Sequence, residues 1–166
     1  KKTQKILCGK FRKGHFEGVL DVLNRFVKLI SPKAVYMGEK DYQQFFLTKN
    51  FIEKNHKTKI YLCKTIRDSN KVALSSRNKL LGSSDLKTAS LIANKLIYLK
   101  KKIIKHQFKS KVLTQLKKKE LITKFNIRID YLECRNLIDL STNLHKKPFK
   151  LFIAYYLNNV RLIDNF

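Results

Sequence analysis

The chain has 166 residues, of which 43% are apolar, so it can bury a core as one compact domain or two small ones. With 5 Gly and 2 Pro it is not a collagen-like or low-complexity chain, and no apolar run approaches the roughly 18 residues that a membrane span requires. The formal net charge of +25 makes a basic nucleic-acid-binding module one hypothesis.

Lysine supplies most of the 37 basic residues, and Asn and Ile are also abundant, as in chains shaped by A/T-rich codons. Proteins that read base edges and phosphates more often use arginine, whose planar group binds two acceptors at once. We therefore expect no specific nucleic-acid partner and no membrane partner. The chain begins without Met and without the apolar core of a signal peptide, which suggests a sequence cut from something longer.

Three cysteines lie far apart, at Cys8, Cys63 and Cys134, and the four histidines are scattered. An odd number of cysteines without a Cys-x-x-Cys pair is typical of reduced thiols, so we expect a cytoplasmic protein. No His or Cys spacing matches that of metal ligands, so we expect no metal held by protein side chains.

The first half of the chain alternates helix and strand. Apolar residues at helical spacing predict a helix over 16–30, which Pro32 ends. A short apolar run predicts a strand over 34–37, ending at Gly38. A second helix is expected over 41–55 and a second strand over 59–66. This alternation, with tight connections, is typical of a parallel α/β sheet.

After residue 83 the pattern changes to long helices followed by alternating strands. We expect Ser83 or Ser84 to cap the first helix, because a hydroxyl at this position accepts from the first free amides. Asn158-Asn159 predicts a two-residue hairpin turn, since Asn tolerates positive φ. The domain boundary is accordingly placed near Gly82. The expected elements are helices over 86–104 and 112–125 and strands over 127–131, 150–157 and 160–163.

Three clusters carry chemistry. In parallel sheets ligands bind beyond the carboxyl ends of the strands, which places Gly38–Asp41 and 67–78 at the ligand edge. Residues 9–18 hold three of the five glycines, as expected of a backbone that turns tightly or approaches a ligand. Lys40 stands at a helix start, which favours anions. Ser75-Ser76-Arg77 offers two hydroxyls and a cation to phosphate oxygens.

Taken together and in this order, the clusters closely resemble the pantoate–β-alanine ligase (pantothenate synthetase) family. The resemblance covers essentially all 166 residues but only the later, C-terminal part of a family member. The family's first segment, with a His-x-Gly-His-type nucleotide motif, lies outside this sequence. The matching stretches are Leu7–Gly9, Gly14–Val19, Gly38–Gln44, Ala73–Asn78 and Arg161–Asn165.

The resemblance implies a fold and a reaction. The fold would be the second half of a Rossmann-like parallel sheet of the class I nucleotidyl-transferase type over 1–82, followed by a small α+β lid domain over 83–166. Family members use ATP with Mg²⁺ to form a pantoyl-adenylate and release pyrophosphate. β-Alanine then displaces AMP to give pantothenate, on the pathway to coenzyme A. A homodimer is expected for the full-length enzyme.

The resemblance also assigns roles to residues. Lys40 would neutralise the ATP phosphates and the transition state, because adenylation brings a carboxylate to a phosphorus already crowded with negative charge. Asp41 and Gly38 would hold the ribose, and Ile66 and Leu74 would contact adenine through their backbones. The residues expected to catalyse are Lys40, Ser75, Ser76 and Arg77. Those expected to bind ATP are Gly38, Glu39, Lys40, Asp41, Ile66, Leu74, Ser75, Ser76 and Arg77.

The other substrates involve a different group of residues. Gln44 would bind pantoate through its side-chain amide, and Arg12 and His15 would lie near the pantoate and β-alanine end. Two departures from the family pattern precede Ser75: Leu74 replaces a residue that is often Met, and Val72 stands where Gly is usual. They concern the flexibility of this loop rather than the chemistry. Besides the ligase, the alternatives are the basic nucleic-acid module and an inactive fragment of the ligase.

Overall fold

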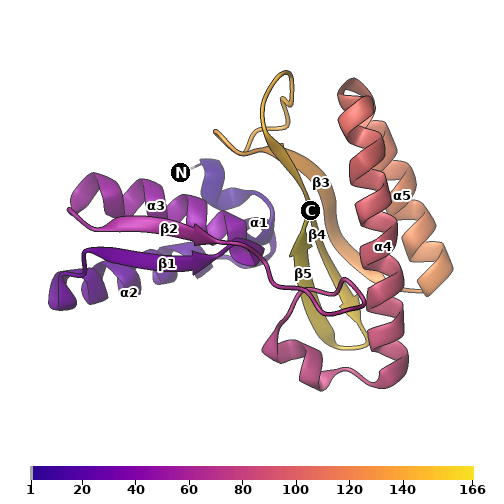
Figure 1. Ribbon diagram of the computed structural model, residues 1–166, viewed down its shortest axis with the longest axis horizontal. Helices are drawn as coiled ribbons and strands as arrows, with labels where there is room; N and C mark the ends of the chain where they lie inside the picture. The colour runs from indigo at the N-terminus through magenta and orange to yellow at the C-terminus, as the bar shows by residue number, and fades with distance from the viewer. Residues whose placement is uncertain (1) are drawn as a thin grey trace. The chain divides into compact units, whose positions relative to one another are not determined.

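The computed structural model describes residues 2–166, which form two compact units (Figure 1). The N-terminal unit ends at Thr65, and the C-terminal unit runs from Ile66 to Phe166. This division falls earlier than the expected boundary near Gly82. The reason is packing: Val72 and Leu81 lie in the hydrophobic core of the C-terminal unit, and Arg67 forms an ion pair with Asp164.

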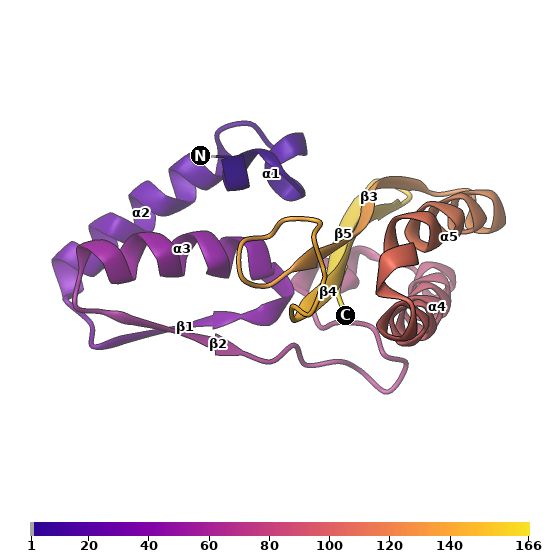
Figure 2. The ribbon, with the colours of Figure 1, turned by 90° about the horizontal axis from the view of Figure 1, so that it is seen from above.

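The N-terminal unit confirms the expected alternation of helix and strand. Strands β1 and β2 pair in parallel, in register from Ala34↔Lys59 to Gly38↔Cys63. Helix α3 covers one face of this pair, and α2 packs on α3 (Figure 2). The elements are η1 Lys2–Lys5, α1 Cys8–Phe11, α2 His15–Ile30, β1 Ala34–Gly38, η2 Glu39–Asp41, α3 Tyr42–Asn55 and β2 Lys59–Cys63.

The second strand is shorter than the sequence pattern predicted. It ends at Cys63 rather than at residue 66, because the backbone beyond Cys63 forms hydrogen bonds outside the β1–β2 pair. The amide of Thr65 donates to the Glu39 carboxylate, and Leu74 donates to the carbonyl of Ile66. Residues 64–66 therefore belong to the connection at the carboxyl end of the sheet.

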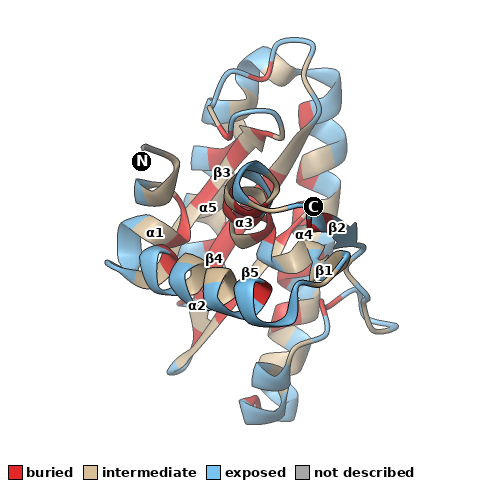
Figure 3. Ribbon diagram, turned by 90° about the vertical axis from the view of Figure 1, so that its left-hand side faces the viewer, coloured by how far each residue is buried: buried red, intermediate tan, exposed pale blue. Residues whose placement is uncertain are grey.

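Much apolar surface of the N-terminal unit is open to solvent. Ile52 and Ile60 are buried between α3 and the strands, yet the opposite face of the sheet carries Tyr36 and Tyr61, which are 69% and 51% exposed. Their rings stack on each other with centroids 5.5 Å apart. Figure 3 shows that the ribbon of α2 is largely exposed. Its exposed residues include four large apolar ones: Val22, Phe26, Leu29 and Ile30.

The C-terminal unit is an antiparallel sheet in the order β3-β4-β5, with α4 and α5 side by side on one face (Figure 2). Its core includes Leu96, Ile103, Leu121, Leu151 and Ile153, all nearly inaccessible to solvent. The elements are η3 Ser76–Leu80, α4 Ser83–Lys105, η4 Gln107–Lys109, α5 Ser110–Phe125, β3 Arg128–Asn136, β4 Phe149–Leu157 and β5 Val160–Asn165.

The ends of these elements test the local sequence signals. Asn158 adopts a φ of 51° between β4 and β5, which confirms the expected hairpin. The expected cap of α4 was wrong. Ser83 is the first residue of the helix, and the N-cap is Gly82, which has no side chain that could accept a capping hydrogen bond. None of the helices described over residues 2–166 combines the length and apolar character needed to cross a bilayer.

Candidate functional site

The Gly38–Asp41 cluster lies at the carboxyl end of β1, as expected. Gly38 pairs with Cys63 at the last position of the parallel register. Glu39 then turns back, and its carboxylate accepts a hydrogen bond of 3.3 Å from the amide of Thr65. Glu39 thus fastens the end of β1 to the segment after β2, and a ligand at this edge would meet both.

Lys40 and Asp41 form an ion pair at this edge. The Nζ–Oδ2 distance is 3.5 Å, and the exposed fractions of the side chains are 19% for Lys40 and 49% for Asp41. A partly shielded ammonium attracts anions more strongly than one in open water. The space beside Gly38 is open, because a Cβ atom placed on this residue would have no neighbouring atom within 4 Å. Its backbone is therefore open to close approach.

Two consecutive glutamines in this cluster have different surroundings. Gln43 is buried, and its amide nitrogen donates to the carbonyls of Thr3 and Ile6 at 2.9 and 2.8 Å. Its Oε1 accepts from the amide of Cys8 at 3.1 Å. Gln43 is therefore a structural tie between α3 and the start of the chain. Burial raises the pKa of the neighbouring Tyr42, and the negative charge of Glu39 adds to the rise.

Gln44 instead lines a hollow of about 540 Å³ within the N-terminal unit. The hollow brings Gln44 beside His15, from the start of α2, and beside the apolar side chains of Val19, Val22 and Leu23. Gly14, at the N-cap of α2, has a φ of 73°, a conformation that glycine adopts without strain. Two of the three predicted substrate residues thus share one hollow. Arg12, the third, is exposed at the end of α1 and is not among its lining residues.

The Ser75–Arg77 cluster lies in the C-terminal unit. Ser75 is the N-cap of η3, and its Oγ accepts from the amide of Arg77 at 3.3 Å. Ser76 and Arg77 are exposed. The side chain of Asn78 donates to the carbonyl of Ala73 at 3.0 Å and closes the turn. The two hydroxyls and the guanidinium therefore stand on a turn that is fixed by its own hydrogen bonds.

Ile66 and Leu74 lie side by side at the base of this turn. The amide of Leu74 donates to the carbonyl of Ile66 at 2.9 Å, next to an antiparallel bridge between Arg67 and Ala73. Both side chains are exposed. The structure thus brings together the two residues whose backbones were expected to contact adenine, although eight positions separate them in sequence.

Sequence reasoning missed the brace beneath this turn. The guanidinium of Arg67 makes two bonds of 2.8 Å to the Asp164 carboxylate, a third of 2.9 Å to the carbonyl of Asn165, and lies 4.5 Å from the centre of the Phe166 ring. The sequence around Arg67 contains no pattern that indicates a pairing with Asp164, and the sequence around Asp164 contains none that indicates Arg67. The available signal was a lone acid, Asp164, directly after the apolar pair Leu162-Ile163.

Within residues 2–166, no three His, Cys, Asp or Glu side chains gather closely enough to hold a metal ion. The predicted site residues divide between the units: those from Arg12 to Gln44 belong to the N-terminal unit, and those from Ile66 to Arg77 belong to the C-terminal unit.

Comparison with known proteins gives consistent results across the whole chain. The family model described as pantoate-beta-alanine ligase matches residues 1–166. A pantothenate synthetase of Leptospira biflexa is 38% identical over 165 residues, which are 98% of this chain and 58% of that protein. The chain thus spans a little under three fifths of the length of this curated relative.

Solved structures agree. The crystal structure of pantothenate synthetase from Thermus thermophilus superposes with a TM-score of 0.85 at 25% identity, over all of this chain and 60% of that one. The pantoate-beta-alanine ligase from Francisella tularensis, complexed with beta-gamma ATP and beta-alanine, gives a TM-score of 0.72 at 33% identity, over all of this chain and 55% of that one.

Proposed function

This chain belongs to the pantoate-beta-alanine ligase family, and on that premise we propose that it takes part in the ATP-dependent ligation of pantoate to β-alanine. In the reaction expected for the family, the pantoate carboxylate attacks the α-phosphorus of ATP, and pyrophosphate leaves. The amine of β-alanine then attacks the acyl carbon of the pantoyl-adenylate, and AMP leaves with formation of pantothenate.

The observation that carries the proposal is the hollow of the N-terminal unit. Gln44 and His15 provide polar groups beside the apolar wall of Val19, Val22 and Leu23. Pantoate is a small hydroxy acid with a branched apolar carbon, so it needs both kinds of surface. The hollow is also in the size range of small-molecule sites, roughly 300–1,000 Å³. We propose that Gln44 binds pantoate through its amide, with His15 and Arg12 near the pantoate and β-alanine end.

Lys40 would supply the charge. An ammonium at the start of a helix favours phosphate, and stabilisation of developing charge is commonly the largest catalytic contribution. Its pairing with Asp41 keeps the ammonium fixed in a partly shielded position before ATP arrives. Asp41 and the open backbone of Gly38 would receive the ribose, and Glu39 would hold the loop of the nucleotide site in place.

The C-terminal unit would contribute the remaining nucleotide contacts. Ser75, Ser76 and Arg77 would bind the phosphates and then the departing pyrophosphate, and the paired backbones of Ile66 and Leu74 would contact adenine. Mg²⁺ would enter bound to the ATP phosphates, where it usually keeps several waters, rather than in a protein cage. The free thiols of Cys8, Cys63 and Cys134 suit a cytoplasmic location. A homodimer of the longer protein stays a prediction.

The test joins this chain to the portion of the Leptospira biflexa relative that it does not match. The chimera should release AMP only when ATP, pantoate and β-alanine are all supplied, whereas the first step, which releases pyrophosphate, should require only ATP and pantoate. AMP release that does not depend on pantoate would contradict the proposal.

Lys40→Ala in this chimera should lower turnover by at least about 100-fold, equivalent to roughly 3 kcal/mol of lost charge stabilisation. Lys54→Ala is the matched control, since Lys54 is an exposed lysine in the last turn of α3. Equal turnover in the two variants would show that Lys40 contributes no more to catalysis than an exposed lysine, and would contradict its proposed role.

A further inference from the structure

A second cavity lies in the C-terminal unit, away from the candidate nucleotide residues. It has a volume of about 650 Å³ and is enclosed by the first half of α5, by β3 and by the loop that follows β3. Strand β3 is one edge of the sheet, whereas η3, which carries Ser76 and Arg77, packs against β5 at the other edge. The cavity is therefore separate from the turn proposed to bind phosphate.

The floor of this cavity is apolar. Leu132, Cys134 and Leu144 line it, and all three are buried. Burial raises the pKa of the Cys134 thiol to about 12, so the sulfur is neutral at physiological pH and behaves as a small apolar group. Such a floor favours a ligand that carries an apolar body.

The rim is aromatic and positively charged. Phe108 is 81% exposed and lines the cavity together with Lys111. The ammonium of Lys111 makes no ion pair with any residue from 2 to 166. Glu133 is the one acidic residue of the lining, and its carboxylate is paired with Arg135 at 2.9 Å. The unpaired charge of the rim is thus cationic.

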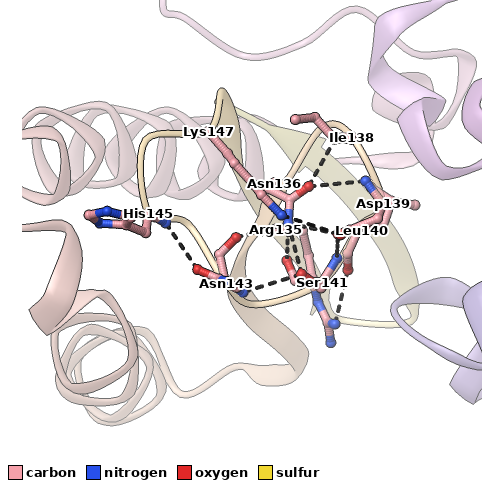
Figure 4. Close-up of polar contacts among 9 residues, drawn as sticks. All are labelled: Arg135, Asn136, Ile138, Asp139, Leu140, Ser141, Asn143, His145 and Lys147. Atoms are coloured by element: carbon pink, nitrogen blue, oxygen red, sulfur yellow. Dashed lines mark hydrogen bonds and ion pairs between the residues drawn. The ribbon is translucent and has the colours of Figure 1, made fainter.

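One wall is held in place by Asn136, which is fully buried. Figure 4 shows its hydrogen bonds to the loop after β3. Its Nδ2 donates to Asp139 Oδ1 at 2.7 Å, to Ser141 Oγ at 2.8 Å and to the carbonyl of Asn143 at 2.9 Å. Its Oδ1 accepts from two backbone amides of the loop, both at 3.0 Å.

The loop after β3 is therefore organised before any ligand arrives. His145 follows this network, and its ring points away from Asn136 in Figure 4. His145 lines the cavity, and its own backbone amide donates to the side chain of Asn143 at 3.2 Å. A wall that is already ordered reduces the entropy lost on binding, which favours a specific ligand site over an incidental gap.

We propose that this cavity binds a small organic anion with an apolar body, of the class of aromatic carboxylates. The carboxylate would lie between Lys111 and His145, and the apolar body would cover Leu132, Cys134 and Leu144, with Phe108 against its open side. The volume is in the range of small-molecule sites, roughly 300–1,000 Å³. The cationic rim selects against amines, and the apolar floor favours an anion that has an apolar body.

The experiment titrates 2-naphthoate into residues 1–166 with ¹³C-labelled leucine methyl groups and follows them by NMR. The methyls of Leu132 and Leu144 should shift with a saturable dissociation constant below about 1 mM, an ordinary affinity for a small ligand of this size. Leu20 and Leu29 of α2, which do not line the cavity, should not follow the same curve. The neutral analogue 2-naphthylmethanol should bind about tenfold more weakly.

Two variants locate the site. Lys111→Glu should weaken 2-naphthoate binding by about tenfold or more, whereas Lys119→Glu, a lysine on the same helix that does not line the cavity, should change it less than about twofold. Gln115→Trp, on the cavity wall, should block binding by filling space. Equal binding by the two charge variants, equal binding of acid and alcohol, or no saturation at several millimolar would each overturn the proposal.

Discussion

The two units of this chain close their cores to different degrees. In the C-terminal unit, α4 and α5 cover one face of an antiparallel sheet. Its buried apolar residues, drawn from positions between Val72 and Leu162, form a single core cluster. The N-terminal unit has a two-stranded parallel sheet with Tyr36 and Tyr61 open on one face. Parallel sheets almost always have both faces covered, because the helices that connect their strands pack on those faces. The C-terminal unit is thus the more self-sufficient structure.

The two edges of the parallel sheet also differ. On the outer side of β2, the amide of Ile60 donates to the Glu53 carboxylate at 3.0 Å, so the helix α3 supplies a partner to that edge. Among residues 2–166, strand β1 pairs only with β2, on one side. An open edge beside an exposed aromatic face favours association. We therefore expect residues 1–166 alone to self-associate. We also expect them to lack ligase activity, since they span under three fifths of the relative's length and catalysis requires two substrates fixed against each other.

The largest expected effect on stability comes from the brace of the C-terminal unit. Arg67→Met leaves the largely buried carboxylate of Asp164 without its partner, which typically costs about 3–5 kcal/mol. Denaturant unfolding followed by NMR signals of β5 should show this loss in the C-terminal unit. The matched control is Arg25→Met, because the Arg25–Asp21 pair on α2 is exposed and is worth about 0–1 kcal/mol. Similar losses in both variants would mean that the brace contributes no more than a surface pair.

A smaller loss is expected for the loop after β3. Asn136→Ala removes the buried amide that joins Asp139, Ser141 and Asn143, and the unsatisfied groups left behind should cost about 1–3 kcal/mol. Thermal unfolding measures this loss. Asn143→Ala is the control, because only its exposed side chain is removed while the carbonyl that Asn136 contacts stays. If the two variants unfold alike, Asn136 does not organise the loop.

The smallest expected effect depends on pH. Hydrogen bonds from the backbone and hydroxyl of Ser141, and then from Asn136, hold the pKa of Asp139 well below its usual value near 3.9. Because the folded-state pKa is lowered, the contribution of Asp139 is present above about pH 4 and is lost as the pH falls further. The free energy of unfolding of the wild type should therefore exceed that of Asp139→Asn at neutral pH, and the difference should shrink as the pH falls below about 4. A difference that does not change with pH would exclude this contribution.

Local sequence patterns predicted most of the fold. Apolar spacing gave helices over residues 16–30 and 41–55 within one or two residues, and the Asn158-Asn159 turn was recognised from its tolerance of positive φ. These features depend on neighbours in sequence. The cap of α4 failed because Ser83 begins the helix rather than preceding it.

Features that depend on distant residues were harder to predict. No spacing indicates that Arg67 pairs with Asp164, or that residues 66–82 pack with the second unit. The same limit applies to the candidate site. The family resemblance assigned roles to Gln44 and His15, and the structure places both around one hollow. The local sequence pattern alone does not distinguish Gln44 from the structural Gln43. The cavity beside β3 has no motif at all, since its lining comes from three separate segments.

Hydrogen exchange on residues 1–166 tests most directly the claim that the two units differ in self-sufficiency. Amides in β4 and α4 should exchange only through global opening of the C-terminal unit, whereas amides in β1 and α2 should exchange through local opening and at least about 100-fold faster. Peptides from residues 84–166 should accordingly be the best protected of the chain. Uniform protection from Phe16 to Phe166 would contradict the account, because it would mean that the open face of the N-terminal unit costs no stability.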